Sequence, residues 1–431
     1  MSASSGVFSR PVTIVGAGLA GLTCAVELNR AGIPIRLLEA SDGIGGRVRT
    51  DQVEGFRLDR GFQVFFPAYP EAQRLLDLAA LDLRPFEPGA LIRAAERFHK
   101  VLDPFRRPME ALAGLMAPVG TLTDKLGVLR LRSEALAMPL ETIFSLPERT
   151  AEAVLREAGI SDLMLDRFFR PFLGSIFLDR SLGTSSRMFY FVYRMLAGGD
   201  TTLPAQGMGA IPAQLADRLP AGVIQFRSRV ARVARIGDEF WIILTNGDRL
   251  SADVVVVATE GAVASRLTGA FPAPEPRAVT CLYFAAEKAP LEEPLLVLDG
   301  DGRGPVTTLC VPSRVAPAYA PPGAHLISAA VLGNPAETDE VLEAAVREQL
   351  GGWFGGSEVA SWRHLRTYRI PLALFDQRPG VLEPASRPVR LQPGLYVCGD
   401  HVENASINGA MAAGRRAAEA VVVDLKGAVQ P

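Results

Sequence analysis

Two kinds of hydrophobic pattern alternate along this 431-residue chain. Short uninterrupted apolar runs are typical of strands buried on both faces, whereas apolar residues three and four positions apart are typical of helices packed on one side. Residues 12–15 form a short run of the first kind, residues 22–30 show the second pattern, and residues 35–38 follow as a second short strand segment. Gly32 suits the end of that helix. This order predicts a strand, a turn, a helix and a second, parallel strand.

Helical patterns dominate residues 70–200, and strand patterns are frequent after residue 222. The predicted helices lie near 70–79, 108–117, 149–158 and 161–170, before an aromatic segment at 187–196 that we interpret mainly as helical core, with some rings free to line a substrate cavity. The predicted strands lie at 223–226, 230–235, 240–245, 249–250, 253–258, 278–286, within 305–332 and at 395–398, and further helices at 337–353 and 407–425. Asn246-Gly247 predicts a hairpin turn between two of these strands.

The turn after residues 12–15 carries the first candidate chemistry, Gly16-Ala17-Gly18-Leu19-Ala20-Gly21, a G-x-G-x-x-G pattern. Its first glycine permits a tight turn, its second lets the backbone approach a pyrophosphate, and its third lets helix and strand pack closely. Glu39 lies 18 residues after Gly21, close to the spacing of about 20 for a carboxylate that binds a ribose 2′-hydroxyl. These residues predict a dinucleotide site at a helix N-terminus; a glycine-rich turn without a ligand is the alternative.

Two further motifs point to a larger cofactor. Gly43-Ile44-Gly45-Gly46-Arg47-Val48-Arg49-Thr50 exposes backbone N–H groups, and Arg47 can pair with a phosphate, whereas Arg49 is as readily a surface residue. The predicted strand 395–398 ends in Gly399-Asp400, where a carboxylate can bind a ribose or ribityl hydroxyl. A helix that begins near Ile407 would direct its positive end at a ligand. A plain NAD dehydrogenase leaves both motifs unexplained.

The chain resembles the flavin-containing amine oxidase superfamily in three segments: residues 16–50, residues 395–418, and Gln206-Gly207-Met208-Gly209-Ala210-Ile211-Pro212. That superfamily includes amine oxidases, protoporphyrinogen oxidases and phytoene-desaturase-type enzymes. The resemblance is loose over 85–200 and 270–385. It implies FAD, and no cysteine stands where a covalent flavin link would form. The cofactor-binding residues that it implies are Gly16, Gly18, Ala20, Gly21, Glu39, Gly45, Gly46, Arg47, Gly61, Phe62, Val230, Gly399, Asp400, Ser406 and Ile407.

The resemblance also implies a fold. We expect an α/β fold (α+β overall), with a Rossmann-like FAD-binding domain built from discontinuous segments and an inserted substrate domain of helices and an antiparallel sheet. The expected FAD-binding domain comprises residues 8–84, 201–270 and 386–426, and the expected substrate domain comprises 85–200 and 271–385.

The chain departs from typical amine oxidases on the substrate side. The position of an aromatic residue on the substrate face of the flavin is Ser406, and Tyr368 is the candidate for a second aromatic. The four candidates for residues at the reacting face are Gln63, Ser406, Arg60 and Tyr368. Lys288 is a candidate for the lysine that many amine oxidases place near flavin N5. His401 is the histidine nearest the expected flavin, as a base or in packing and hydrogen bonding.

Three functions remain open. The first is a desaturase or dehydrogenase that removes a hydride from an apolar small molecule to flavin N5, with oxygen or a quinone as electron acceptor. The second is an amine oxidase that produces an imine and hydrogen peroxide. The third is a redox-neutral isomerase or a non-catalytic FAD-binding protein.

The composition bears on the partners, the metal sites and the location of the protein. The formal net charge of −2 and pI near 6.2 give no case for nucleic acid as a partner. The four cysteines form no C-x-x-C pair, and with four histidines we expect no metal site and buried reduced thiols. The N-terminus lacks a signal peptide pattern, and no apolar run reaches the ~18 residues of a membrane span. We therefore expect a cytoplasmic protein, in which the apolar residues 109–119 form a buried helix or touch a membrane surface.

Overall fold

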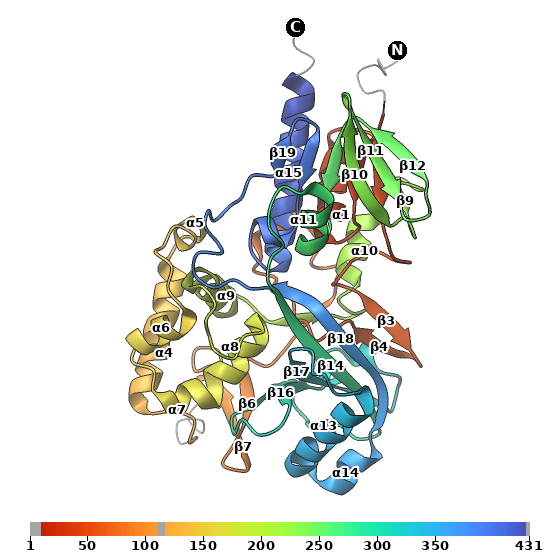
Figure 1. Ribbon diagram of the computed structural model, residues 1–431. Coiled ribbons are helices and arrows are strands. Elements are labelled where there is room, and N and C mark those ends of the chain that lie inside the picture. Colours follow the sequence, from red (N-terminus) through yellow and green to blue (C-terminus); the bar gives the residue numbers. More distant parts are fainter. Residues whose placement is uncertain (1–9, 110–116, 428–431) are drawn as a thin grey trace.

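The computed structural model describes residues 10–109 and 117–427. Figure 1 shows an upper part that contains α1 (Leu19–Arg30) and α15 (Ile407–Gly427), and a lower part that contains a larger sheet with helices on its left and below it. The mixture of parallel and antiparallel sheets agrees with the expected fold class. The expected domain boundaries stay a prediction.

A six-stranded sheet forms the centre of the upper part. Its strands, in spatial order, are β19 (Arg390–Gln392), β20 (Leu395–Val397), β13 (Val255–Val257), β1 (Val12–Val15), β2 (Ile35–Leu38) and β9 (Ile224–Gln225). All neighbours are parallel except β19 and β20. The residues of β1, β13 and β20 are all buried, as the uninterrupted apolar runs predict. This sheet joins segments from the start, middle and end of the chain.

Helices α1 and α15 pack closely against each other. A Cβ atom at Gly414 would lie 2.2 Å from the carbonyl oxygen of Ala20, so the approach of the two helices depends on that glycine. Helix α1 begins at Leu19 rather than at residue 22, because the last residues of the glycine motif already belong to the helix.

A three-stranded antiparallel sheet lies beside this core. It consists of β10 (Val230–Ile236), β11 (Glu239–Leu244) and β12 (Arg249–Ala252). Strands β11 and β12 are antiparallel neighbours on either side of Asn246-Gly247, and Gly247 has φ 94°. The predicted hairpin turn is confirmed, since a positive φ is what such a turn demands.

The lower sheet has seven strands. In spatial order they are β18 (Arg363–Phe375), β14 (Pro276–Ala286), β17 (His325–Leu332), β16 (Val306–Cys310), β15 (Leu296–Asp299), β6 (Gly89–Ala94) and β7 (Arg97–Leu102). Only β15 and β6 are parallel. The long strands β14 and β18 pair with each other and run from the lower part towards the upper part (Figure 1). Pro371 fits within β18 because this strand is the sheet edge, where a missing N–H is tolerated.

Helices cover this sheet. Those drawn on its left in Figure 1 are α4 (Leu122–Ala137), α5 (Leu140–Ile143), α6 (Ala151–Glu157), α7 (Asp162–Met164), α8 (Arg170–Phe177) and α9 (Ser186–Gly198). The other described helices of four or more residues are α2 (Pro70–Leu75), α10 (Ala210–Ala216), α11 (Gly261–Thr268), α12 (Pro312–Val315), α13 (Asp339–Phe354) and α14 (Gly356–Ser361). A short hairpin pairs β3 (Thr50–Val53) with β4 (Phe56–Asp59), and a two-stranded antiparallel sheet pairs β5 (Leu83–Pro85) with the sequence-distant β8 (Thr202–Pro204).

Three helix predictions need correction or qualification. The helix expected at 70–79 ends at Leu75, because the Asp77 side chain caps the N–H groups of Ala79 and Ala80 in a turn. The helix expected at 161–170 continues to Phe177 through a π-helical turn at Leu165–Phe169. That turn accommodates Pro171, whose ring would clash with an α-helical carbonyl four residues earlier. Most of the helix expected at 108–117 lies outside the described residues.

The aromatic segment packs as core. Residues 188–192 in α9 are all buried, and the Phe189 and Tyr193 rings stack 5.4 Å apart. The four cysteines are free and buried. In the part of the chain that the structure describes, no helix combines the length and apolar character needed to cross a membrane.

Candidate functional site

The first glycine loop shows three different reasons for glycine. Gly16 has φ 108°, and a Cβ there would lie 2.7 Å from the carbonyl oxygen of Ala258. A Cβ at Gly21 would lie 1.9 Å from the carbonyl oxygen of Gly16. A Cβ at Gly18, in contrast, would meet no atom of the described residues within 4 Å. No contact among these residues requires glycine at 18, so the open space there fits a cofactor phosphate that must approach the backbone.

Glu39 fixes this loop and has capacity for a ligand. One carboxylate oxygen accepts the N–H of Ala17 and the other accepts the N–H of Ser41, both at 2.8 Å. A carboxylate has about four acceptor positions, so ribose hydroxyls can still donate to it. The carbonyl of Glu39 also accepts the N–H of Ser228 at 2.8 Å. That bond brings the chain before Val230, a buried residue at the start of β10, next to Glu39.

The second glycine loop faces the first. The N–H of Gly45 donates to the carbonyl of Ala17 at 2.8 Å. Gly46 has φ 59°, and a Cβ there would lie 3.4 Å from the Cα atom of Gly18. The two loops therefore bracket the open space at Gly18. Ala20 is buried within α1 behind this space.

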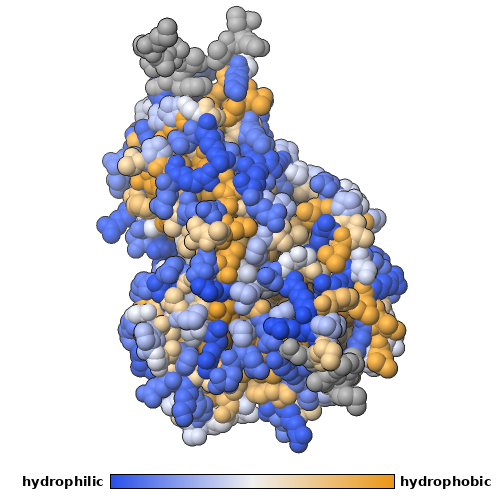
Figure 2. Space-filling model, turned by 180° about the vertical axis from the view of Figure 1, so that it is seen from behind, coloured by the Kyte–Doolittle hydropathy of each residue, from blue (hydrophilic) through white to orange (hydrophobic). Residues whose placement is uncertain are grey.

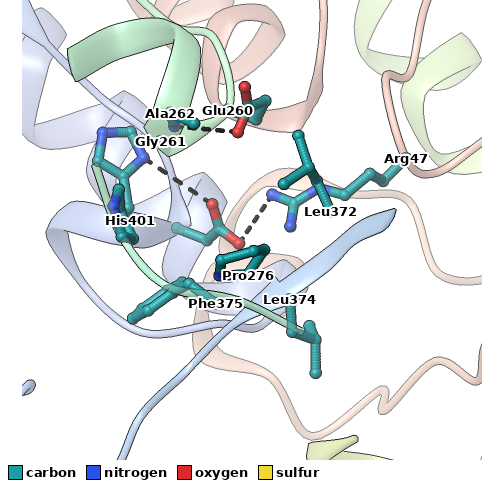
Figure 3. Close-up of a pocket in the computed structure, with 11 residues that line it drawn as sticks. Arg47, Glu260, Gly261, Ala262, Pro276, Leu372, Leu374, Phe375 and His401 are labelled. Carbon is teal, nitrogen blue, oxygen red and sulfur yellow. Dashed lines mark hydrogen bonds and ion pairs between the residues drawn. The ribbon is translucent and has the colours of Figure 1, made fainter. Parts of the chain in front are cut away.

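Arg47 and Asp400 connect the second loop with the C-terminal motif. The Arg47 guanidinium lies 2.7 Å from the Asp400 carboxylate and donates to the carbonyl of Ala373 in β18 at 2.9 Å. Both side chains line a cavity that Glu260, the N-terminal residues of α11, Phe375 and His401 also line (Figure 3). The structure thus brings Arg47 together with Asp400 and His401, which are adjacent to each other in a distant segment.

His401 is buried beside this pair. Its ring stacks on Phe271 with centroids 5.4 Å apart, and its Nδ1 atom is 4.0 Å from an Asp400 oxygen. Within residues 10–109 and 117–427, neither ring nitrogen has a hydrogen-bond partner. Burial lowers the pKa of His401 below its ordinary value, against the Asp400 carboxylate, which acts to raise it. A buried imidazole without partners and an open glycine cradle both fit a polar cofactor here.

Two of the four residues expected at the reacting face, Arg60 and Tyr368, bind the same carboxylate. Arg60 binds Asp51 through two guanidinium nitrogens at 3.0–3.2 Å, and the Tyr368 hydroxyl donates to the same carboxylate at 2.8 Å. Burial and this bond raise the pKa of Tyr368 to about 12. Gln63 lies apart from Asp51 and donates to the carbonyls of Arg47 and Arg60.

Gly61 and Phe62 lie between Arg60 and Gln63 in the sequence. Gly61 has φ 86°, and a Cβ there would lie 2.6 Å from the Ile370 side chain of β18. Phe62 packs edge-on against Phe86, with ring centroids 6.4 Å apart. This segment therefore lies against the strand that carries Tyr368.

Ser406 and Ile407 begin α15 as expected. The Ser406 hydroxyl accepts the N–H of Gly409 at 2.9 Å and donates to Asn404 at 2.6 Å. Lys288 is exposed just beyond β14.

Two buried polar residues near the site were missed by the sequence analysis. Gln377 accepts the N–H of Ala405 at 2.8 Å through its side chain and the N–H of Ser185 at 2.7 Å through its carbonyl. It thereby fixes the segment before Ser406. Nothing in the local sequence indicates this role, because both partners are distant along the chain.

Asp59 is the second missed residue. Its carboxylate accepts hydrogen bonds from Thr50, from Tyr319 at 2.7 Å and from the N–H of Met208 at 3.0 Å. Burial raises the pKa of Asp59 to about 6, although these bonds act to lower it. Its place two residues before Gly61 was the available signal. It anchors that segment to the glycine–methionine turn at 206–212.

Comparisons with known proteins agree with the geometry. A profile of the family described as flavin containing amine oxidoreductase matches residues 19–422. The chain is 28% identical over 366 residues to phytoene dehydrogenase from Streptomyces griseus, covering 73% of this chain and 71% of that protein. It is 30% identical over 183 residues to coproporphyrinogen III oxidase from Mycobacterium leprae (strain TN), covering 39% of this chain and 38% of that protein. An oxidoreductase structure from Methanosarcina mazei matches with a TM-score of 0.72 at 19% identity, over 95% of this chain and 100% of that chain. That last likeness concerns the fold.

Proposed function

This chain belongs to the family of flavin-containing amine oxidoreductases, and on that basis we propose that it binds FAD without a covalent link. The observation that carries the proposal is the open space at Gly18, bracketed by two glycine loops and bordered by Glu39. Glu39 suits an adenosine ribose, which FAD has and FMN lacks. The burial of all four cysteines supports a non-covalent cofactor.

The residues around the cavity divide the work of binding. Arg47 would turn from Asp400 to a phosphate, and Asp400 would accept a hydroxyl. The N-terminus of α15, at Ile407, presents partial positive charge beside the flavin ring. When bound, the flavin supplies a two-electron acceptor at N5. The protein positions the substrate, excludes water and stabilises negative charge on the reduced ring.

For the substrate, we propose an apolar small molecule that is oxidised in a desaturase-like reaction. The similarity to phytoene dehydrogenase over 73% of the chain supports this class. Ser406 stands at the position where typical amine oxidases have an aromatic residue. The hydroxyl of Tyr368, the candidate for the second aromatic residue, donates a hydrogen bond to Asp51. Gln63, Arg60, Tyr368 and Ser406 stay our candidates for the reacting face. Oxygen or a quinone would reoxidise the flavin.

The amine oxidase function is the second candidate, because it is the activity in the family's description. It predicts hydrogen peroxide release with an amine. The redox-neutral function predicts turnover without a net change in the oxidation state of the flavin.

We also propose that the enzyme works in the cytoplasm and touches a membrane surface through α4. Leu122 and Leu126 are 73% and 65% exposed, one helical turn apart, and Leu136 is exposed along the same side. Figure 2 shows hydrophobic surface on the right of the lower part, the side on which α4 lies in that view. An exposed apolar stripe of this kind is typical of interaction surfaces, and a bilayer would deliver an apolar substrate.

The test has two steps. The visible spectrum of the purified protein, and of the ligand released by heat, should show flavin bands and free FAD. A colourless protein that takes up no added FAD would overturn the proposal. If FAD is present, anaerobic bleaching with polyenes in vesicles and with an amine panel separates the two substrate classes. Peroxide release and quinone reduction identify the electron acceptor.

A further inference from the structure

The ring of His401 packs tightly against neighbouring residues. Its side chain is 1% exposed, and its ring lies over Gly399, where a Cβ would come within 2.5 Å of the ring atom Cε1. Gly399 has φ 153°, at the edge of the region that favours glycine. Phe271 stacks on the ring at 5.4 Å. The ring orientation is thus fixed by a glycine beneath it and an aromatic ring beside it.

This fixed ring has two unused nitrogens. Both Nδ1 and Nε2 are buried without a hydrogen-bond partner among the described residues, and the nearest carboxylate oxygen, on Asp400, is 4.0 Å from Nδ1, beyond hydrogen-bond distance. Buried polar atoms are rarely left unpaired, because their desolvation is then uncompensated. His401, Arg47 and Asp400 line a cavity of about 20 Å³, which is the space of one hydroxyl group or one water molecule (Figure 3).

The chemistry of the ring indicates which partner fits. Burial keeps the imidazole neutral, so one nitrogen donates and the other accepts. A phosphate diester offers acceptors alone and pairs only with the protonated nitrogen, whereas a hydroxyl, which both donates and accepts, can pair with whichever nitrogen faces it. Arg47 already supplies the cation that a phosphate needs.

We propose that His401 binds a hydroxyl of the ribityl chain of the cofactor, next to Asp400. The inference rests on the proposed FAD function. It makes His401 a cofactor-binding residue that holds the chain between phosphate and flavin ring.

The experiment compares His401→Phe and His401→Asn with the parent protein. Phenylalanine keeps the stacking on Phe271 and removes both nitrogens, while the asparagine amide keeps one donor and one acceptor. The dissociation constant of FAD is measured by flavin fluorescence, that of ADP by calorimetry, and the melting temperature on the cofactor-free protein. ADP contains the adenosine diphosphate part of FAD and lacks the ribityl chain.

We expect His401→Phe to weaken FAD by about tenfold or more, to leave ADP binding unchanged, and to leave the melting temperature of the cofactor-free protein equal or higher, since two unpaired nitrogens are lost. His401→Asn should recover part of the FAD affinity. Unchanged FAD affinity in His401→Phe, an equal loss for FAD and ADP, or a lower melting temperature with unchanged affinity would each overturn the inference. If the parent protein itself binds no FAD, the proposed function fails instead.

Discussion

The Arg47 guanidinium lies 2.7 Å from the Asp400 carboxylate, so the loop after the second strand and the loop after the last strand of the central sheet are joined by one ion pair. Asp400 is buried and Arg47 is about one-third exposed. The pair places a guanidinium and a carboxylate at the same cavity, and in the proposed function the two groups would separate when a cofactor offers each of them a better partner.

Replacing Arg47 with Gln should therefore weaken the binding of FAD by about tenfold or more. It should also lower the melting temperature of the cofactor-free protein, because the buried Asp400 carboxylate loses its cation. Arg49→Gln is the matched control, since Arg49 pairs with the exposed Asp42. Titration of FAD by fluorescence and thermal melting provide both readouts. Equal FAD affinities in the two variants would contradict the assignment.

Substitutions of two glycines in the first loop should affect different properties, FAD binding at Gly18 and the stability of the cofactor-free protein at Gly21. Gly18→Ala places a methyl group in open space, and Gly18 has φ −74°, which alanine adopts freely. We expect the cofactor-free variant to melt as the parent does but to bind FAD about tenfold more weakly or worse. Gly21→Ala, with its clash against Gly16, should instead destabilise the cofactor-free protein. A Gly18→Ala protein with full FAD affinity would exclude the phosphate position.

Asp59 should make stability depend on pH. Its folded pKa of about 6 exceeds the ordinary 3.8, so the neutral acid is favoured in the folded state. The neutral acid therefore stabilises the folded state by roughly 3 kcal/mol relative to the ionised acid. This stabilisation is fully present below about pH 4 and is lost as the pH rises through about 6. Urea unfolding of the parent and of Asp59→Asn between these pH values isolates the effect. Stability should fall with rising pH in the parent relative to Asp59→Asn, and a constant difference would refute the shift.

The leucine stripe of α4 should mediate membrane contact. Leu122→Gln with Leu126→Gln removes two exposed apolar side chains, and we expect about tenfold weaker binding to vesicles of phosphatidylcholine and phosphatidylglycerol. The melting temperature should not change, because neither side chain is buried. Ile236→Gln, at an exposed position of β10 (63% exposed), is the control and should bind as the parent does. Equal co-sedimentation of all variants would refute this surface.

Local sequence patterns predicted two kinds of element: strands that are buried on both faces, and turns or helix ends whose interacting residues are near one another in the sequence. The runs at 12–15 and 255–257 form central strands because both faces are covered, and the glycine motif forms its turn because Gly16 adopts φ 108° and a side chain at Gly21 would clash with Gly16. The predicted start of α15 holds because Ser406 caps it. These features are written in a few adjacent residues.

Features that depend on distant partners were not predictable. Strand β18 contains Pro371 and alternates little, so only its pairing with β14 defines it. The engagement of Arg60 and Tyr368 by Asp51 joins three segments. Cys24 and Cys398, distant in sequence, are neighbours, and the Cys398 thiol together with burial raises the pKa of Cys24. Each depends on long-range packing that a window of sequence does not contain.

In the proposed function, the bond from Arg47 to the carbonyl of Ala373 would give the edge strand of the lower sheet a part in holding the cofactor. Strand β18 also carries Tyr368, a candidate for the reacting face. A substrate that displaces this strand would then change the affinity for the cofactor, and by thermodynamic reciprocity the cofactor would change the affinity for that substrate by the same factor. The two ligands would be coupled through the backbone of one strand.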